Sequence, residues 1–299
     1  MLMLAKKTPK AIVLTVDHGL REGSAADAKA VLRAAKALGL KAHMLSWKGR
    51  KPKSDIEARA REARYRLMGE WCAAHGIENL YLAHTIEDQA ETFLLRLARG
   101  SGLDGLSAMQ EIAPYPLPGF GALKLVRPLL SVTRGELRAR LKKAGLAWRD
   151  DPMNEDPRFA RVRIRQSWPA LAELGLSPAR VAAASGHLAR AREALERATA
   201  ELIVASCRVE EGRVMVDGEA LMRAPREIGL RALAALLGRV GGRAYRPRFE
   251  RLERLFDCLG QGRPATLHGC RIGPAPARYA CFGGKTLLIA PENPRNSRG

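Results

Sequence analysis

The chain is poor in aromatic residues and has no long apolar run. Aromatic residues make up 5% of its 299 positions, which argues against the base-stacking platforms of single-strand-binding proteins. No apolar run approaches the roughly 20 residues that span a bilayer. The lysines at positions 6 and 7 follow the first apolar residues, whereas the charges of a signal peptide precede them. We therefore expect neither a membrane-spanning segment nor a secretory leader.

Cysteine is also scarce, and no two cysteines have the C-x-x-C spacing of a metal site. The five positions are Cys72, Cys207, Cys258, Cys270 and Cys281. Their odd number and wide spacing argue against a zinc site, an iron–sulfur cluster and a disulfide framework. They suit a reducing compartment, so the predicted location is the cytoplasm.

Acidic residues are too few to balance the basic ones. Lys and Arg number 51 against 31 Asp and Glu, which gives a net charge of +20 and a pI near 10.4. A field of this sign attracts polyanions, and the excess of Arg over Lys favours bidentate phosphate contacts. Nucleic acid is the predicted partner, and an anionic membrane surface is the weaker alternative.

Strand-like and helix-like segments alternate in the first half of the sequence. Strands are predicted at 11–16, 41–46 and 79–83, and helices at 24–38, 54–75 and 86–98. Ser54 with Glu57 has the spacing of a capping box, and Gly76 is a stop signal. The alternation predicts right-handed βαβ units, and hence an α/β fold with a Rossmann-like parallel sheet.

The second half predicts a different domain. An edge strand at 123–126 and a helix at 133–145, capped by Thr133, complete the first part. A domain from about residue 171 is expected to be mostly helical, with helices at 178–208, 225–239 and 247–259. It is expected to end in a small β meander at 264–289, in which Gly283-Gly284 forms a hairpin turn.

The segment His84–Gly102 carries the densest set of polar residues. Thr85 with Asp88 fits a capping box at a helix start. Asp88 and Glu91 stand one helical turn apart, so their carboxylates can converge. His84 follows a predicted strand, and ligands of open α/β sheets bind at the carboxyl ends of strands. A solvated polar helix face is the alternative, but the position after a strand favours a site.

Four blocks of the sequence resemble the bacterial tRNA(Ile)-lysidine synthases, which belong to the PP-loop family of ATP pyrophosphatases. The blocks are Val16–Arg21, Glu57–Tyr65, His84–Met109 and Arg127–Leu130. A looser fifth block runs from Asp150 through Asn154 and Asp156 to the arginines at 161, 163 and 165 and Pro169. The resemblance covers residues 11–170 in order, and it is only loose over 171–299.

The resemblance implies a two-step reaction. ATP adenylates C2 of the wobble cytidine in the CAU anticodon of an isoleucine tRNA, and L-lysine then displaces AMP to give lysidine. It implies a synthetase domain at 1–170 and a tRNA-binding region at 171–299, with ATP, lysine, this tRNA and ATP-bound Mg²⁺ as partners. It assigns no protein-bound metal, and the oligomeric state is left open.

The same resemblance assigns residues to roles. Arg64, Asp88 and Glu91 are expected to be catalytic: the two carboxylates would hold the lysine ammonium groups, and Arg64 would hold a carboxylate or phosphate. Residues expected to contact lysine or tRNA are His84, Arg99, Arg127, Arg161, Arg163 and Arg165. Asp17 and His18, after the first predicted strand, are assigned to ATP.

Plain structural roles remain for several of these residues. Arg64 shares its predicted helix with Arg59, Arg61 and Arg66, where exposed arginines are common. His18 and His84 can be strand-end histidines with satisfied hydrogen bonds. The alternation of arginines at 161, 163 and 165 also fits a solvated edge.

One family feature is missing from the sequence. PP-loop enzymes carry a Ser-Gly-Gly-x-Asp-Ser loop whose N–H groups cradle the ATP phosphates, and no such sequence occurs here. Met1–Lys7 reads as the last turns of a helix. We therefore expect that a strand, this loop and most of a helix belong before Met1, and that the chain as written is inactive. A PP-loop tRNA thiolase and a noncatalytic RNA-binding remnant are the alternatives. The lack of C-x-x-C pairs argues against the thiolase.

Overall fold

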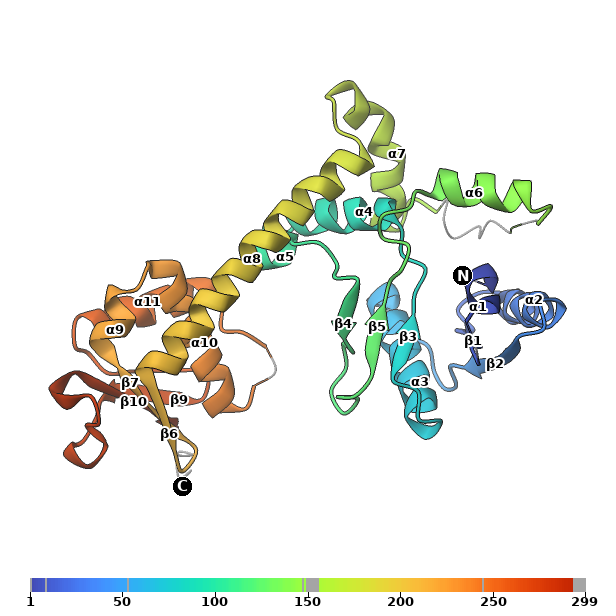
Figure 1. Ribbon diagram of the computed structural model, residues 1–299. Helices are drawn as coiled ribbons and strands as arrows, with labels where there is room; N and C mark the ends of the chain where they lie inside the picture. Colours follow the sequence, from blue (N-terminus) through green and yellow to red (C-terminus); the bar gives the residue numbers. More distant parts are fainter. Residues whose placement is uncertain are drawn as a thin grey trace. The chain divides into compact units, whose positions relative to one another are not determined.

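A computed structural model describes residues 2–8, 10–52, 54–146, 148, 156–243 and 245–292 (Figure 1). The chain forms two compact units, Met1–Gly186 and His187–Gly299. The acidic segment 150–155, part of the fifth block, lies outside the described residues. Within the described ranges, no helix combines the length and apolarity needed to cross a membrane.

The first unit alternates strands and helices as the sequence predicts. Its elements are α1 (Leu2–Lys6), β1 (Ile12–Asp17), α2 (Ser24–Ala37), β2 (Lys41–Ser46), α3 (Ile56–Ala74), β3 (Asn79–Tyr81), α4 (Ile86–Leu97), α5 (Leu103–Leu106), β4 (Ile112–Pro114), β5 (Lys124–Val126), α6 (Arg134–Lys143) and α7 (Ala160–Glu173). The helix α8 (Pro178–Ser206) begins in this unit.

The strands of this unit form two sheets. β1 pairs in parallel with β2, with Ile12 opposite Lys41. The other sheet has the order β3-β5-β4, in which β3 and β5 are parallel and β4 is antiparallel to β5. The predicted α/β fold with parallel strand pairs is confirmed.

The prediction of an edge strand at 123–126 is wrong. β5 is central because β3 pairs with one of its sides and β4 with the other. β4 ends at Pro114 and was hidden in a proline-rich stretch that resembles a loop. Proline is tolerated there because β4 is itself an edge strand.

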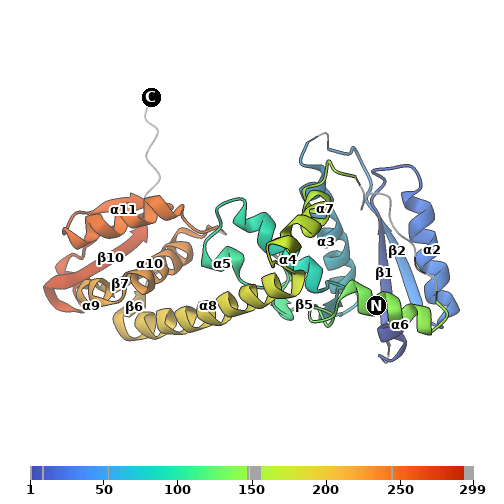
Figure 2. The ribbon, with the colours of Figure 1, turned by 90° about the horizontal axis from the view of Figure 1, so that it is seen from above.

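The helix α3 packs against both sheets (Figure 2). Its buried residues Tyr65, Met68 and Cys72 form a core with Leu80 of β3 and Leu125 of β5. Partly buried residues of β1 and β2, namely Leu14, Val16 and Leu45, pack against the same core. Two sheets that share no strand pairing in the described residues are therefore joined through one helix.

The predicted helix ends are confirmed at some positions and wrong at one. α3 starts at Ile56, and its N-cap Asp55 has a left-handed φ of 51° and no side-chain cap. The capping box predicted at Ser54 is therefore wrong. Gly76 follows the helix with φ 62°, as a stop signal requires. Thr133 caps α6 in a complete capping box.

The described part of the second unit contains an antiparallel sheet, three further α-helices and two short 3-10 helices. The elements after α8 are β6 (Cys207–Glu210), β7 (Arg213–Asp217), α9 (Gly218–Arg223), α10 (Arg226–Gly241), α11 (Phe249–Gly260), β8 (Ala265–Leu267), β9 (Cys270–Pro274) and β10 (Thr286–Pro291). The strand order is β6-β7-β10-β9-β8. The core lies between α10, α11 and the sheet and includes Leu233, Leu237, Ile272 and Ile289.

The predicted meander is confirmed as β8-β9-β10, but its turn is not a hairpin at Gly283. Residues Gly283–Lys285 form a 3-10 helix that leads into β10. The unit boundary at Gly186 also lies beyond the boundary predicted at 170. The start of α8 is tied to the first unit, because Ser185 Oγ donates to Leu106 O (2.8 Å) and Ala108 N donates to Ser185 O (3.2 Å).

Candidate functional site

The start of α4 is fixed by the capping box that the sequence predicts. Thr85 donates to Asp88 Oδ2 from its backbone N (2.8 Å) and from its Oγ1 (2.9 Å). Burial opposes ionisation of Asp88, but the Thr85 N–H bond and the charge of Arg134 outweigh it, so the pKa of Asp88 is lowered. Asp88 is thus a fixed carboxylate at the carboxyl end of β3.

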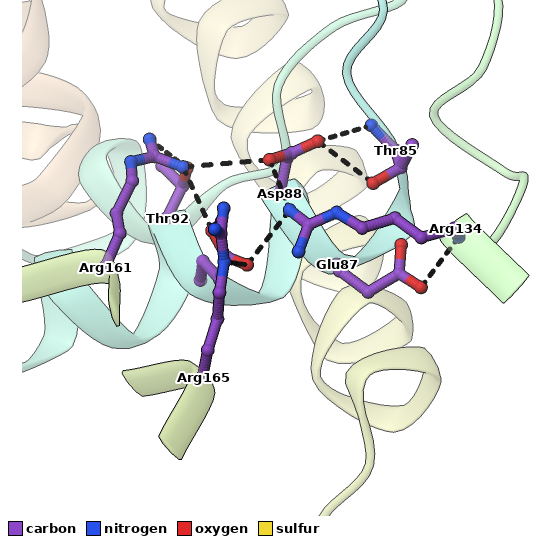
Figure 3. Close-up of polar contacts among 8 residues, drawn as sticks. Thr85, Glu87, Asp88, Thr92, Arg134, Arg161 and Arg165 are labelled. Carbon is purple, nitrogen blue, oxygen red and sulfur yellow. Dashed lines mark hydrogen bonds and ion pairs between the residues drawn. The ribbon is translucent and has the colours of Figure 1, made fainter. Parts of the chain in front are cut away.

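Glu91 lies one turn further along α4 and has no exposed surface. Its Oε1 accepts from Arg165 Nε at 2.7 Å and lies 3.0 Å from Arg134 Nη2. Its Oε2 accepts from Arg161 Nη1 at 3.4 Å and from Arg165 Nη2 at 3.2 Å. A buried carboxylate of this kind requires such partners, and Figure 3 shows the three guanidinium groups converging on α4.

Arg134, the first residue of α6, joins both carboxylates. Its Nη2 is 2.8 Å from Asp88 Oδ1, and its backbone N donates to Glu87 Oε1 at 2.8 Å. Burial disfavours the charged guanidinium, but Glu91 and Asp88 more than compensate and raise the pKa of Arg134. Three acidic side chains of α4 therefore hold the start of α6 (Figure 3).

A cavity of about 700 Å³ lies in front of this cluster. Leu14, Thr15 and Val16 of β1 line it on one side, and Leu82 and Ala83, just after β3, line it on the other. Its polar lining consists of His18, Arg61, Arg64, His84, Asp88, Arg161 and Arg165. Four arginines against one carboxylate make the cavity positive, as a site for anionic groups requires.

His84 stands at the wall of this cavity with a buried Nδ1 that has no hydrogen-bond partner among the described residues. Desolvation is the main reason that the pKa of His84 falls to about 4. Arg127, Arg61 and Arg161 lower it further, whereas Asp88 raises it. His84 is consequently neutral near pH 7, and one ring nitrogen is left to bond a ligand.

Asp17 and His18 follow β1 but behave differently. Asp17 Oδ1 accepts from Ser24 Oγ and from Gly19 N (3.1 Å), and the Ser24 bond is the main reason that the pKa of Asp17 is lowered. Asp17 is not among the cavity-lining residues. His18 does line the cavity, and its Nδ1 accepts from Leu20 N at 3.0 Å.

Arg64 and Arg127 differ in how far they are exposed to solvent. Arg64 points to the cavity, where the surrounding protein lowers its pKa although its surface stays accessible to water. Arg127 is buried: its Nη1 donates to Gln110 O at 2.7 Å, and burial lowers its pKa. The structure therefore brings Arg64, but not Arg127, to the cavity.

The three predicted arginines of α7 lie on two different faces of the helix. Arg161 and Arg165 are four residues apart and both reach Glu91. Arg163 is exposed and donates to Pro157 O (2.9 Å) and Arg158 O (3.0 Å). Arg99 is exposed just beyond α4 and away from the cavity lining.

Two further site residues escaped prediction. Arg134 had no signal, because its partners in α4 are more than forty residues upstream in the sequence. Arg61 lines the cavity and donates to the Tyr65 hydroxyl at 3.2 Å. Its spacing of three residues from Arg64 placed it on the same helix face, and this signal was available. In the described residues, no group of three or more His, Cys, Asp or Glu side chains could hold a metal ion.

Parallel strand pairs with a cationic cavity beside their carboxyl ends place the protein in the class of α/β folds whose ligands bind at that edge of the sheet. In agreement with this class, residues 1–171 match the PP-loop domain family.

Curated relatives narrow the class further. The chain is 40% identical to the tRNA(Ile)-lysidine synthase of Ruegeria pomeroyi, over 88% of this chain and 62% of that protein. It is 40% identical to the enzyme of the same name from Methylobacterium nodulans, over 96% of this chain and 84% of that protein. It is 39% identical to the tRNA(Ile)-lysidine synthase of Rhodopseudomonas palustris, over 98% of this chain and 85% of that protein. The chain belongs to the tRNA(Ile)-lysidine synthase family.

The chain therefore spans 62% of the Ruegeria protein and about five sixths of the other two. One solved structure with partial likeness is the U34-tRNA thiolase NcsA from Methanococcus maripaludis, at 14% identity and a TM-score of 0.47, covering 62% of this chain and 61% of that chain.

Proposed function

We propose that the protein ligates L-lysine to C2 of the wobble cytidine in the CAU anticodon of tRNA(Ile), using ATP and passing through an adenylated tRNA. The observation that carries this proposal is the cavity itself. It offers arginines of α3 and α7 for anionic groups, a neutral histidine that follows β3 and the single carboxylate of Asp88 on α4. An adenylation site needs this mixture, because it holds phosphates, a base and an amine together.

Phosphates and the lysine carboxylate are the ligands proposed for the cavity arginines. Arg64 and Arg61 supply charge from α3 and form no ion pair with the described side chains, so an anion that binds there displaces no described carboxylate. Asp17 and His18 remain proposed for ATP, with His18 the one that lines the cavity. Mg²⁺ is proposed to arrive on the ATP phosphates, since no described carboxylate group forms a metal site.

The lysine ammonium is proposed to bind Asp88. Asp88 is the one carboxylate among the cavity-lining residues, and it keeps its charge at neutral pH because its pKa is lowered. The predicted contact of lysine with Glu91 remains a proposal too, but it requires Arg161 or Arg165 to move aside first. The neutral His84 is proposed to hydrogen-bond the cytidine or the incoming amine.

The tRNA is proposed to bind through its backbone. The net charge of +20 provides the general attraction, and residues 171–299 are proposed as the tRNA-binding region. Arg99 and Arg163 are exposed, as phosphate ligands need to be. Arg127 is proposed to act from within the protein, because it is buried. A cytoplasmic location stays a prediction.

ATP capture is proposed to need a Ser-Gly-Gly-x-Asp-Ser loop that the sequence does not contain. One side of β1 and the residues after β3 line the same cavity, and β1 and β3 each pair with a single strand in the described residues. A further parallel strand between them would deliver such a loop to the cavity mouth. Its N–H groups would then bind the phosphates that the arginines attract.

The test is ATP-dependent incorporation of labelled lysine into a tRNA(Ile) transcript with a CAU anticodon. The chain is assayed alone and with an added upstream strand, loop and helix start. We expect incorporation by the extended form, none with a UAU transcript, and little by the chain alone. If neither form incorporates lysine but both bind the tRNA, the noncatalytic RNA-binding alternative replaces the proposal. Robust incorporation by the chain alone would refute the need for the loop.

A further inference from the structure

A second cavity, of about 630 Å³, is lined by a different set of α3 residues from the first. Its wall combines the segment after β2 with residues of α3. The lining residues that matter are Trp47, Arg50, Lys51, Pro52, Arg59 and Arg66. None of these lines the first cavity, and the reaction proposed above leaves them without a role.

The spacing of arginines along α3 explains why the helix faces two cavities. Arg61 and Arg64 are three residues apart and line the first cavity. Arg59 and Arg66 are seven residues apart, which is two helical turns, and they line the second. One helix therefore presents cations in two directions. The second cavity also contains an aromatic residue, Trp47, which a merely solvated helix face does not explain.

Much of the charge in the second cavity is not neutralised by the protein. Arg66 pairs with Glu62 at 3.0 Å, and both side chains are exposed. The guanidinium groups of Arg50 and Arg59 form no ion pair or hydrogen bond with the described side chains, and both residues are exposed. With Lys51, the cavity holds four cations against the single carboxylate of Glu62. Such an excess attracts a phosphate.

The cavity also holds an aromatic ring in a fixed place. Trp47 N donates to Asp17 O at 2.9 Å, which anchors the residue at the carboxyl end of β1. Lys51 Nζ lies 4.3 Å from the centroid of the indole ring and donates to Trp47 O. Indole rings bind the faces of nucleobases. A base and a phosphate can therefore be held within one cavity.

We infer that this second cavity binds an unpaired nucleotide of the RNA substrate, with its base against Trp47 and its phosphate on Arg50 and Arg59. The inference rests on the proposed function, because it takes the anticodon loop as the occupant. Both cavities are lined by α3, a helix about 10–12 Å across with its side chains. An RNA strand that crosses this helix places one nucleotide in the first cavity and a neighbouring one in the second.

The test uses tryptophan fluorescence of the full chain. The chain has four tryptophans. A variant with Trp71→Phe, Trp148→Phe and Trp168→Phe leaves Trp47 as the only tryptophan reporter. The probe is a synthetic RNA hairpin with a CAU loop. We expect the hairpin to quench Trp47, and Trp47→Ala in the natural background to weaken hairpin binding about 5- to 150-fold, the range for loss of one stacked base.

Matched variants separate binding from folding and from general charge. Trp47→Phe should restore most of the affinity, because a phenyl ring still stacks. Arg59→Gln should weaken binding and reduce its salt dependence, whereas Arg33→Gln, on the exposed side of α2, should reduce affinity much less. AMP in place of the hairpin distinguishes a free nucleotide site from an RNA site.

Three results would overturn the inference. They are a hairpin that binds without affecting Trp47, a Trp47→Ala variant of unchanged affinity, and quenching by AMP but not by the hairpin. Failure of the proposed function looks different. In that case the natural chain itself would not bind the hairpin, or the extended form would bind it and incorporate no lysine.

Discussion

The Nε atom of Arg165 lies 2.7 Å from Oε1 of Glu91, a carboxylate with no exposed surface. This contact joins α7 to α4, and Arg134 and Arg161 bind the same carboxylate from α6 and α7. The three guanidinium groups keep between a quarter and a third of their own surface. Glu91 is thus a buried anchor for arginines that face outward, and several predictions depend on it.

Replacing Glu91 should destabilise the first unit. Glu91→Gln keeps the size of the side chain but removes the charge that holds three arginines, which can partly regain water. We expect a loss of about 1–3 kcal/mol in the free energy of unfolding. Chemical denaturation followed by tryptophan fluorescence measures it, because every tryptophan lies in the first unit. Glu62→Gln, in an exposed pair of the same unit, is the control and should change stability by less than about 0.5 kcal/mol. An equal effect of both changes would show that Glu91 anchors nothing.

Asp88→Asn should separate the two steps of the reaction in the extended form. The amide cannot bind an ammonium group as strongly as a carboxylate, so lysine incorporation should fall about ten-fold or more. Adenylation of the tRNA, measured by release of pyrophosphate, should persist in part. Normal lysine incorporation by Asp88→Asn would exclude Asp88 as the ammonium ligand.

His84 should make stability depend on pH. Its pKa of about 4 in the folded protein lies below the usual value of about 6.5. Between these values the unfolded chain binds the proton and the folded one does not, so stability falls as the pH drops from 6.5 to 4 and is retained above 6.5. The loss is at most about 3.4 kcal/mol, from about 2.5 pKa units at about 1.36 kcal/mol each.

The comparison that isolates this effect is His84→Asn, which has no titrating ring. Unfolding curves of the natural chain and the variant at pH 4 and pH 7 give the difference. We expect the natural chain to lose more stability on acidification than the variant does. Parallel losses would mean that His84 titrates normally in the folded state.

Arg163 should contribute to the salt dependence of tRNA binding. An exposed phosphate ligand releases about 0.9 counterions per contact on duplex-like RNA, so Arg163→Ala should lower the slope of log K against log salt by about one. Arg161→Ala and Arg165→Ala should instead reduce stability, because these side chains bind Glu91. An unchanged slope for Arg163→Ala would place the RNA footprint elsewhere, with residues 171–299 the next region to test.

Local signals made part of the site predictable. Thr85 and Asp88 fixed the start of α4 by their spacing alone, and His84 was placed at a strand end by the apolar residues before it. Features that depend on distant partners were not predictable. Glu91 reads as a polar helix residue until α6 and α7 bring their arginines to it.

Other errors came from ambiguous local patterns. The arginines at 161, 163 and 165 suggested alternation, yet Ala160–Glu173 is a helix, so the first and last share a face and the middle one does not. Pro114 suggested a loop, although it ends an edge strand. In both cases the neighbouring element, rather than the residue itself, decided the structure.

The open sides of β1 and β3 affect how the protein behaves at high concentration. Each strand has backbone N–H and C=O groups on one side without a strand partner in the described residues, and β1 and the residues just after β3 line the same cavity. Such groups pair readily with any extended peptide. Samples of this chain should therefore self-associate through edge-to-edge strand pairing as concentration rises, and a short peptide that pairs with these strands should keep them monodisperse.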